Sequence, residues 1–566
     1  MNRYIRRITI GLLSGASAGA ALAFTFDRPM MGLIFGTVLG AFYAASLRPV
    51  RGAYADCVMT AAALGVPFWG ICNVIALPLF ASQKPDWTAE GMRAHFPQLV
   101  GWVLYGVVFG LVDQFLSDSA TAMWGPEPEA SAPATAAHTR IVILGGGFAG
   151  MKTAECLERE LEKNISARIT LVSETNALLF TPMLAEVAGS SLEPSHISTP
   201  LRSSLPRTEF IRARVTEIDL EKRCVRIEGL HSGGEVAARR EISYDHLVLA
   251  LGAVSNYLGM KTVEDLAFNF KSLLDAIRIR NHVIEMFERA DREPDPILRA
   301  PLLTFVIAGG GFAGVELAGA LNDFSHGILA DYPNLDRSEV RVVLVHSRDR
   351  ILPELSESLA RYALKKMAER GVEFRLNARL TDAKPGVVIL SDGEIPAETL
   401  VWTAGTAPSP IVKALDVEKD KRGAVIVGKN LAISSRTGVW ALGDCAAVVD
   451  AKSGTPCPPT AQFALREAAV LAKNIAAQLN GGVSKEFHFD SLGALCVIGH
   501  QTACAELTVP FARTRAIRFS GLLAWLMWRG IYLAKLPGIE RKLRVLFDWT
   551  VELFFPRDIV QTIDLK

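Results

Sequence analysis

The sequence has little that would support disulfide, zinc or nucleic-acid chemistry. Its eight cysteines are scattered, without any C-x-x-C or C-x4-C spacing, so a disulfide framework and a zinc site are both disfavoured. Sixty Lys and Arg residues against 59 Asp and Glu leave a net charge of +1. Such a balance gives no general attraction for nucleic acid or acidic partners. We therefore expect neither a metal site nor nucleic-acid binding.

Charged residues are also scarce in the first part of the chain, where long apolar segments take their place. Half of the 566 residues are hydrophobic and the mean hydropathy is +0.25, which indicates membrane segments. Four apolar segments are each near the length that crosses a hydrocarbon core of about 30 Å as a helix: Ile8–Phe26, Met30–Leu47, Cys57–Phe80 and Phe96–Leu116. We expect residues 1–116 to form four transmembrane helices.

Positive charges predict how these helices are oriented. Arg3, Arg6 and Arg7 precede the first segment, and Arg48 and Arg51 follow the second. Such residues mark the cytoplasmic side, so after four crossings the large C-terminal region is expected in the cytoplasm. The prediction is a multi-pass protein of the cell inner (cytoplasmic) membrane, and a cleaved signal peptide is the alternative for the first segment. Because ionisable residues are rare within the segments, they favour an anchor over a pump.

A glycine-rich turn follows a Pro- and Ala-rich stretch, residues 117–139, that predicts a linker. The run R-I-V-I-L-G-G-G-F-A-G predicts a strand, a tight turn and a helix, with the spacing Gly145-x-Gly147-x-x-Gly150 of a dinucleotide-binding turn. The helix N-terminus then faces the phosphates. The next apolar strand ends before Glu174, where a carboxylate would bond the ribose hydroxyls.

The same hexapeptide, G-G-G-F-A-G, recurs at Gly309–Gly314 after another apolar strand, and two such turns imply two bound dinucleotides. The second unit differs in one respect, because its next strand ends in His346-Ser347-Arg348 where Glu or Asp would be expected. A carboxylate there favours NADH, whereas a nearby arginine can accommodate the 2′-phosphate of NADPH. Arg348 could equally be a solvated loop charge.

Three further predicted strands end in residues that could contact a bound cofactor. Tyr244–Gly252 and Trp402–Gly405 each close on a glycine, and Thr437–Asp444 ends in Gly-Asp. Asp444 could hydrogen-bond the ribityl chain of a flavin, or it could be only a turn residue.

Together these motifs resemble the flavoproteins that have one FAD-binding and one NAD(P)H-binding domain. A closer likeness is to the type II, single-subunit, non-pumping NADH:quinone oxidoreductases. It is carried by F-T-P-M-L-A-E-V-A (180–188), G-F-A-G-V-E-L-A-G (311–319), P-P-T-A-Q (458–462) and the apolar, basic run 520–558. The likeness covers about residues 139–566.

The resemblance implies an α/β fold with two Rossmann-like dinucleotide-binding domains, preceded by the four transmembrane helices and followed by amphipathic, membrane-associating helices. The expected boundaries are 140–300 and 425–500 for the two parts of the FAD-binding domain, 301–424 for the NAD(P)H-binding domain and 501–566 for the C-terminal region.

The resemblance also implies the residues of the site. Residues expected around FAD are Gly145, Gly147, Phe148, Ala149, Gly150, Glu174, Gly252, Asp444 and Gln462. Residues expected around NADH are Gly309, Gly311, Phe312, Gly314, Glu316 and Gly405. Glu316 near the nicotinamide and Gln462 near the quinone are the catalytic candidates. One departure is that the family's A-Q-x-x-x-Q-Q ends here in Arg466-Glu467, which puts the identity of the electron acceptor in doubt.

The composition of the C-terminal region predicts contact with a membrane independently of the family resemblance. Apolar residues from Ile539 onward follow helical spacing, and the nine Lys/Arg against four Asp/Glu between Phe511 and Asp558 give +5. Basic charge with Trp residues favours an interfacial helix pair. A fifth span over Phe519–Leu536 is disfavoured by Arg529, which would cost about 2.5–3.5 kcal/mol at its middle. Burial in the core or in a homodimer interface is the other alternative.

These patterns predict a membrane-bound, FAD-dependent NADH dehydrogenase. Hydride would pass from NADH to the flavin, and two electrons would then pass to a membrane quinone without proton pumping. Two alternatives stay open, a reductase of another electron carrier and a membrane-anchored redox sensor.

Overall fold

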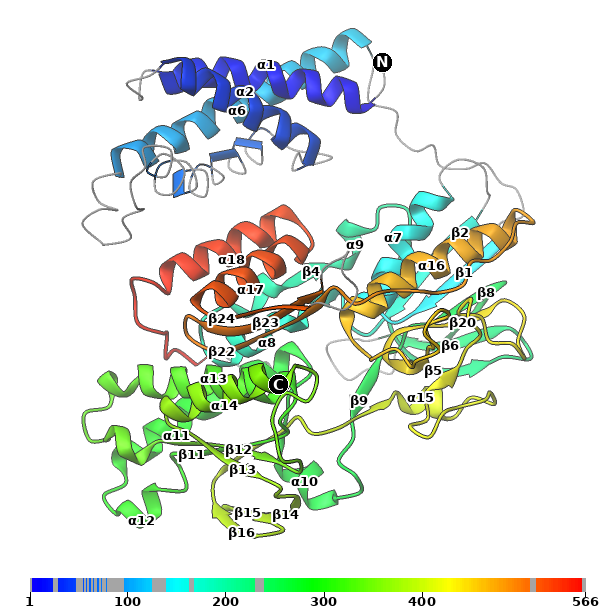
Figure 1. Ribbon diagram of the computed structural model, residues 1–566. Coiled ribbons are helices and arrows are strands. Elements are labelled where there is room, and N and C mark those ends of the chain that lie inside the picture. The colour runs from blue at the N-terminus through cyan, green and yellow to red at the C-terminus, as the bar shows by residue number, and fades with distance from the viewer. Residues whose placement is uncertain are drawn as a thin grey trace. The chain divides into compact units, whose positions relative to one another are not determined.

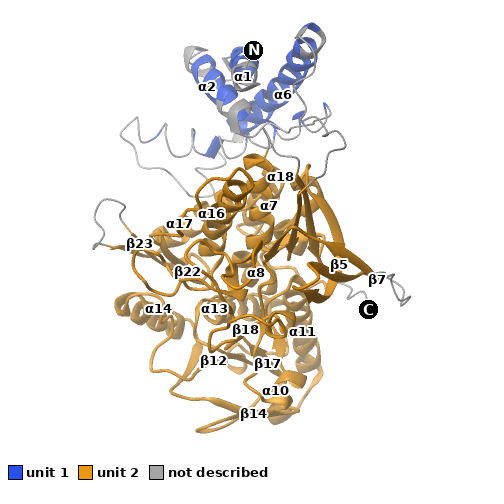
Figure 2. Cartoon of the chain, turned by 90° about the vertical axis from the view of Figure 1, so that its right-hand side faces the viewer, with its two compact units in different colours: residues 1–132 blue, residues 133–566 orange. Residues whose placement is uncertain are grey.

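The computed structural model describes residues 3–23, 29–46, 96–124, 139–161, 167–229, 239–508 and 516–561, with isolated positions between 54 and 78. The chain divides into two compact units, Met1–Ala132 and Pro133–Lys566 (Figure 2).

Among its described residues, the first unit contains three long helices, α1 (Arg3–Ala23), α2 (Pro29–Ser46) and α6 (Phe96–Trp124). Glycines let α1 and α2 pack closely, because a Cβ at Gly15 would lie 2.4 Å from the carbonyl oxygen of Gly36. The Tyr105 hydroxyl of α6 donates to that same carbonyl at 2.7 Å. Gly15 and Gly36 therefore lie in a close packing surface between α1 and α2.

The four predicted spans are not confirmed as a set. Among the described residues, one helix, Pro97–Ala120, is long and apolar enough to cross a membrane, and Ile8–Ala20 is a shorter apolar helix. The predicted third span, Cys57–Phe80, lies largely outside the described residues. Helix α6 also continues to Trp124, so the segment expected to be a linker from residue 117 begins as helix.

In the second unit, a seven-stranded sheet carries the first glycine turn. Its order is β20-β8-β1-β2-β5-β6-β7, parallel from β20 to β5. Its strands are β1 (Thr139–Leu144), β2 (Ala167–Ser173), β5 (Glu209–Asp219), β6 (Cys224–Gly229), β7 (Arg239–Ser243), β8 (His246–Leu249) and β20 (Val439–Ala441). Buried parallel strands are covered on both faces, which explains the unbroken apolar run of β1. Helices α7 (Phe148–Glu160) and α16 (Ala461–Leu479) pack against each other beside it (Figure 1).

A five-stranded parallel sheet carries the second glycine turn, in the order β10-β17-β11-β12-β13. Its strands are β10 (Phe268–Asn269), β11 (Thr304–Ala308), β12 (Arg341–His346), β13 (Val372–Leu376) and β17 (Thr399–Trp402), with helices α11 (Leu273–Arg292), α13 (Phe312–Gly327) and α14 (Glu357–Glu369) nearby. Two parallel α/β units, each built on a glycine turn, confirm the predicted fold class for this part of the chain.

The C-terminal segment forms a three-stranded antiparallel sheet and two helices (Figure 1). These elements are β22 (Gly493–Gly499), β23 (Thr502–Thr508), β24 (Ala516–Gly521), α17 (Leu522–Lys535) and α18 (Ile539–Val551). Phe324 of α13, Cys504 of β23 and Trp528 of α17 belong to one hydrophobic core. Strand β22, which lies within the predicted second part of the FAD-binding domain (425–500), pairs with β23 of the C-terminal segment.

Shorter elements make the connections. They are β3 (Ala177–Leu179), η2 (Thr181–Met183), α8 (Leu184–Ala188), η3 (Pro194–Ile197), β4 (Ser198–Pro200), α9 (Leu201–Ser204), β9 (Ala253–Ser255), α10 (Lys261–Leu266), α12 (Pro296–Arg299), η4 (Leu329–Asp331), η5 (Arg337–Glu339), β14 (Leu380–Lys384), β15 (Val387–Leu390), β16 (Gly393–Pro396), β18 (Thr406–Pro408), α15 (Pro410–Lys413), β19 (Val425–Ile426), η6 (Gly443–Cys445) and β21 (Ala446–Ala447).

Candidate active site

The first glycine turn has the geometry of a phosphate-binding turn. Gly145 has φ +108°, and a Cβ there would lie 2.1 Å from the carbonyl oxygen of Ala250. A Cβ at Gly150 would lie 1.8 Å from the oxygen of Gly145, so glycine is required for α7 to pack on β1. Gly147 faces open space and begins α7 without a side-chain cap. The free N–H groups of α7 can therefore receive a pyrophosphate.

The other residues predicted around FAD lie at the same edge of the sheet, because β20, β8, β1 and β2 are parallel and their carboxyl ends meet there. Gly252 follows β8 with φ +63°, and Asp444 lies in η6 after β20. Glu174 follows β2, where the guanidinium of Arg214 donates to its carboxylate at 3.3 Å. Phe148 and Ala149 open α7.

Lys271 is a neighbour of this edge that the sequence did not single out. Its ammonium donates to the carbonyl of Ala253 at 3.1 Å, and burial lowers its pKa. It faces Asp444, whose pKa burial raises while Lys271 counteracts that rise. A lysine that follows a strand and precedes a helix gives no sequence signal by itself, so only the fold brings this charge pair to the edge.

The second glycine turn repeats the first. Gly309 has φ +127° and donates to the carbonyl of Val345 at 2.9 Å, as Gly145 donates to that of Val172 at 2.8 Å. A Cβ at Gly314 would lie 1.9 Å from the oxygen of Gly309. Gly311 begins α13 as its uncapped N-terminal residue, directly before Phe312. Gly405 follows β17 at the same sheet edge. The structure thus offers two separate dinucleotide cradles.

Glu316 and Gln462, the two predicted catalytic residues, contact opposite ends of β22. Glu316 accepts a hydrogen bond from the backbone N–H of Val497 at 3.3 Å. Gln462 donates to the carbonyl of Gly493 at 3.2 Å and accepts from the N–H of Leu492 at 3.1 Å. Four residues of strand correspond to about 13 Å, so the two side chains do not act on one atom together.

The two residues that depart from the family motif, Arg466 and Glu467, lie in different environments. Glu467 is 3% exposed, and its carboxylate accepts the N–H of Gly443 at 2.8 Å. Burial raises its pKa to about 7. Glu467 therefore supports the turn that carries Asp444. Arg466 is exposed, and its guanidinium lies 5.3 Å from the ring centre of Phe489.

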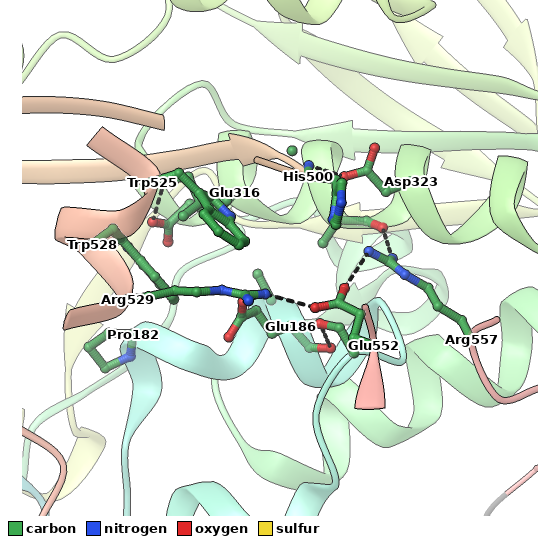
Figure 3. A pocket seen from close by; sticks show the side chains of 15 residues that line it. Pro182, Glu186, Glu316, Asp323, His500, Trp525, Trp528, Arg529, Glu552 and Arg557 are labelled. Carbon is green, nitrogen blue, oxygen red and sulfur yellow. Dashed lines mark hydrogen bonds and ion pairs between the residues drawn. The ribbon is translucent and has the colours of Figure 1, made fainter. Parts of the chain in front are cut away.

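A pocket of about 430 Å³, its open mouth included, lies beside Glu316 and between α8, α13 and the C-terminal helices (Figure 3). Arg529 of α17 points into it toward Glu552 and pairs with that carboxylate at 2.7 Å. Arg557 pairs with Glu552 at 3.2 Å, and Glu186 of α8 lies 3.9 Å from Arg529. We refer to these four residues, Glu186, Arg529, Glu552 and Arg557, as the buried ion cluster.

Burial raises the pKa of two carboxyls in this pocket into the neutral range. Burial raises the pKa of Glu316 to about 8, against the opposing hydrogen bond from Val497. Burial also raises the pKa of Glu186 to about 7, and the nearby guanidinium of Arg529 works against that rise. Trp549 donates to Glu186 at 3.1 Å. Carboxyls that titrate near neutral pH in a pocket can hold and release protons.

Sequence reasoning missed the buried ion cluster. The lone acid in the apolar stretch around Glu186 was a usable signal, because an unpaired charge is rarely buried. Arg529 was interpreted as an obstacle to a membrane span. The structure places its guanidinium 3.8 Å from the ring centre of Trp525 and 4.6 Å from that of Trp549, in an ion pair inside the protein. The 14-residue α17 is also too short for a span.

Comparison with known proteins agrees with this geometry. Residues 139–468 match the family described as pyridine nucleotide-disulphide oxidoreductase, and residues 492–558 match the NDH2 C-terminal domain. A probable NADH dehydrogenase of Dictyostelium discoideum is 34% identical over 75% of this chain and 91% of its own length. A type II NADH:quinone oxidoreductase of Mycobacterium tuberculosis is 31% identical over 76% of this chain and 91% of its own.

Among solved structures, NDH2 from Plasmodium falciparum in complex with NADH has the same fold. Its TM-score is 0.67 at 16% identity, over 75% of this chain and 99% of that one. The sulfide:quinone oxidoreductase of Aquifex aeolicus shares the fold at a TM-score of 0.56, with 20% identity over 74% of this chain and 95% of that one.

The chain therefore belongs to the pyridine nucleotide-disulphide oxidoreductase family, whose members combine a flavin with a nicotinamide nucleotide. Within that family it is a type II NADH:quinone oxidoreductase, as the sequence resemblance predicted.

Proposed function

We propose that the enzyme uses FAD in the first cradle, NADH in the second and a membrane quinone as electron acceptor. The observation that carries this assignment is the pair of glycine turns at the carboxyl edges of two parallel sheets. The first edge presents Asp444 and Lys271, which suit the polar chain and ring of a flavin. A bound flavin would supply the redox chemistry, taking a hydride and giving up two electrons.

The protein itself binds and positions the two nucleotides and supplies protons for the reaction. Gly147 and Gly311 open their helices toward phosphates, so the two nucleotides are held by backbone N–H groups. Glu316 lies in the second turn of α13, the helix whose N-terminus forms part of the NADH cradle. Quinone reduction consumes two protons, and a carboxyl that holds its proton at pH 7 is suited to donate one.

We propose that the C-terminal helices dock on the membrane and bring the site to the quinone. Apolar side chains on these helices and just beyond them are each more than half exposed: Leu522, Leu523, Leu526, Phe547, Leu553, Phe554 and Phe555. Exposed apolar groups in such numbers on neighbouring helices favour lipid contact. The candidate span Pro97–Ala120 supports a second attachment at the N-terminus, with the catalytic domains on the cytoplasmic side.

Proton pumping is not part of this proposal. Helix α2 has no Asp, Glu, Lys, Arg or His, and of these residue types the candidate span of α6 has only Asp113 and Asp118. Ionisable chains inside the membrane are the usual route for protons, so this composition favours an anchor.

The deciding experiment is turnover of the purified flavoprotein with NADH and a soluble quinone, alongside Gln462→Ala. We expect the wild type to turn over and the variant to lose quinone reduction while NADH still reduces its flavin, because Gln462 holds the start of β22. Gln478→Ala is the matched control, since Gln478 is an exposed glutamine of the same helix. Full quinone turnover by Gln462→Ala would refute its role, and rapid flavin reduction without wild-type quinone turnover would refute the acceptor.

A further inference from the structure

We propose that the second cradle accepts NADPH as well as NADH, with Ser347 and Arg348 receiving the 2′-phosphate. This inference rests on the proposed function of that cradle as the nicotinamide nucleotide site. It concerns the adenosine end of the nucleotide, which takes no part in hydride transfer.

The two cradles of this one chain supply the alignment. Gly145 donates to the carbonyl of Val172, and Gly309 donates to that of Val345, so these two valines occupy equivalent positions. The next two positions are Ser173-Glu174 in the first cradle and His346-Ser347 in the second. A carboxylate that binds the ribose 2′-hydroxyl would repel a 2′-phosphate. The second cradle has no carboxylate at either position, and Arg348 follows directly.

Arg348 is available for a ligand. It is exposed, and among the described residues its guanidinium has no ion-pair partner. Its backbone is nevertheless held, because Asn377 donates to the carbonyl of Arg348 at 3.0 Å and Ala378 donates to that of His346 at 3.2 Å. A guanidinium on a fixed turn suits a phosphate, since its planar fork makes charge-assisted hydrogen bonds.

His346 adds a neutral donor at the same edge. Its Nδ1 accepts the N–H of Gly310 at 3.1 Å, so the ring proton resides on Nε2. Nε2 is buried and has no partner in the protein. Burial lowers the pKa of His346, the guanidinium of Arg348 lowers it further and the carboxylate of Asp349 works against both. The ring therefore brings no negative charge beside Ser347, which stands where the first cradle has the carboxylate of Glu174.

The test measures kcat/KM for NADPH and for NADH on the full-length holoenzyme with a soluble quinone. We expect the wild type to oxidise both nucleotides. Loss of a charge-assisted contact in Arg348→Ser should lower kcat/KM for NADPH by about tenfold to 100-fold, through KM, and leave NADH within about twofold. Ser347→Glu should lower the NADPH value still more. Arg361→Ser, an exposed arginine of α14, is the control and should change neither value.

Inhibition by NADP⁺ against NAD⁺ gives a readout of binding that does not depend on the rate of hydride transfer. Arg348→Ser should weaken NADP⁺ inhibition and spare NAD⁺ inhibition. A wild type that oxidises NADH but not NADPH, or an Arg348→Ser variant that affects both nucleotides equally, would overturn the inference and leave the proposed function intact. Absence of turnover with either nucleotide would overturn the proposed function and this inference with it.

Discussion

At the scale of single residues, burial decides what each carboxyl of this enzyme can do. Glu174 lies in the open and pairs with Arg214, so its carboxylate is accessible to a ligand. Glu467 is buried, and its carboxylate accepts a hydrogen bond from the N–H of Gly443. Glu316 is half-buried beside the pocket, and burial raises the pKa of its carboxyl to about 8. Three glutamates therefore have three roles that residue type alone does not distinguish.

Glu316→Gln tests the proton-donor role. Because the pKa of Glu316 is raised to about 8, the carboxyl is protonated below that pH and ionised above it. We expect the rate of quinone reduction to fall as pH rises through about 8. The variant should lose about 10²-fold in rate and lack that inflection, since an amide cannot donate the proton. Steady-state pH profiles measure both effects.

Glu373→Gln provides the control for that profile. Glu373 is a glutamate of the same domain whose pKa is lowered by its hydrogen bond from Arg341. It should keep the wild-type inflection near pH 8. An unchanged inflection in Glu316→Gln would assign the titration to another group.

At the scale of elements, each cradle depends on a contact that only glycine permits. The helix after each turn can pack on its strand because the third glycine of the motif has no Cβ. The strands beneath, β1 and β11, are buried along their apolar residues and fix where the turn begins. The nucleotide-binding geometry of each cradle therefore depends on the close packing of a helix on a strand at one glycine.

Gly150→Ala and Gly314→Ala should separate the two cradles. The first places a Cβ 1.8 Å from the oxygen of Gly145, so we expect purified protein with little bound flavin. The second places a Cβ 1.9 Å from the oxygen of Gly309, so flavin should stay bound while NADH reduces it slowly. Absorbance of bound flavin and anaerobic stopped-flow reduction measure these outcomes.

Gly327→Ala is the matched control, because Gly327 ends the same helix α13 and a Cβ there meets nothing within 4 Å. It should bind both nucleotides normally. Loss of flavin from Gly314→Ala would show that the two cradles are not independent.

At the scale of the whole catalytic unit, the buried ion cluster joins segments that lie far apart in the sequence. Arg529 of α17 bridges Glu552 beyond α18 and Glu186 of α8. Arg557 also donates to the carbonyl of Gly189 at 2.8 Å and to that of Ala320 on α13 at 3.3 Å. The C-terminal helices are thereby tied to both nucleotide-binding domains, next to Glu316.

Arg529→Ala should strongly destabilise this unit. Removing one partner of a buried pair leaves charge uncompensated, and we expect a loss of about 3–5 kcal/mol. Urea unfolding followed by tryptophan fluorescence measures it. Arg544→Ala breaks an exposed pair with Glu540 on α18, and it should cost no more than about 1 kcal/mol. Equal effects of the two variants would contradict a structural role for the cluster.

Much of the fold could be predicted because its signals are local. Gly145–Gly150 and Gly309–Gly314 each encode a turn within six residues, and the apolar strands before them are continuous. The predicted edge residues, such as Gly252 and Asp444, followed strands and were confirmed in that position. Their contacts with bound nucleotides stay predictions. The four-span region stays unconfirmed, because apolar composition is shared by membrane spans and by helices packed through glycine, and one described helix is long and apolar enough to span.

The order of residues was sufficient to identify two dinucleotide-binding units and their family, because a glycine turn depends on neighbours within a few positions. It could not reveal the pocket beside Glu316. Glu186, Glu316, Arg529 and Glu552 come from four distant segments, and their charges depend on how deeply the folded chain encloses them. Desolvation and ion pairing act through space, so the protonation of this site and the anchoring of its C-terminal helices emerged only once the segments were packed together.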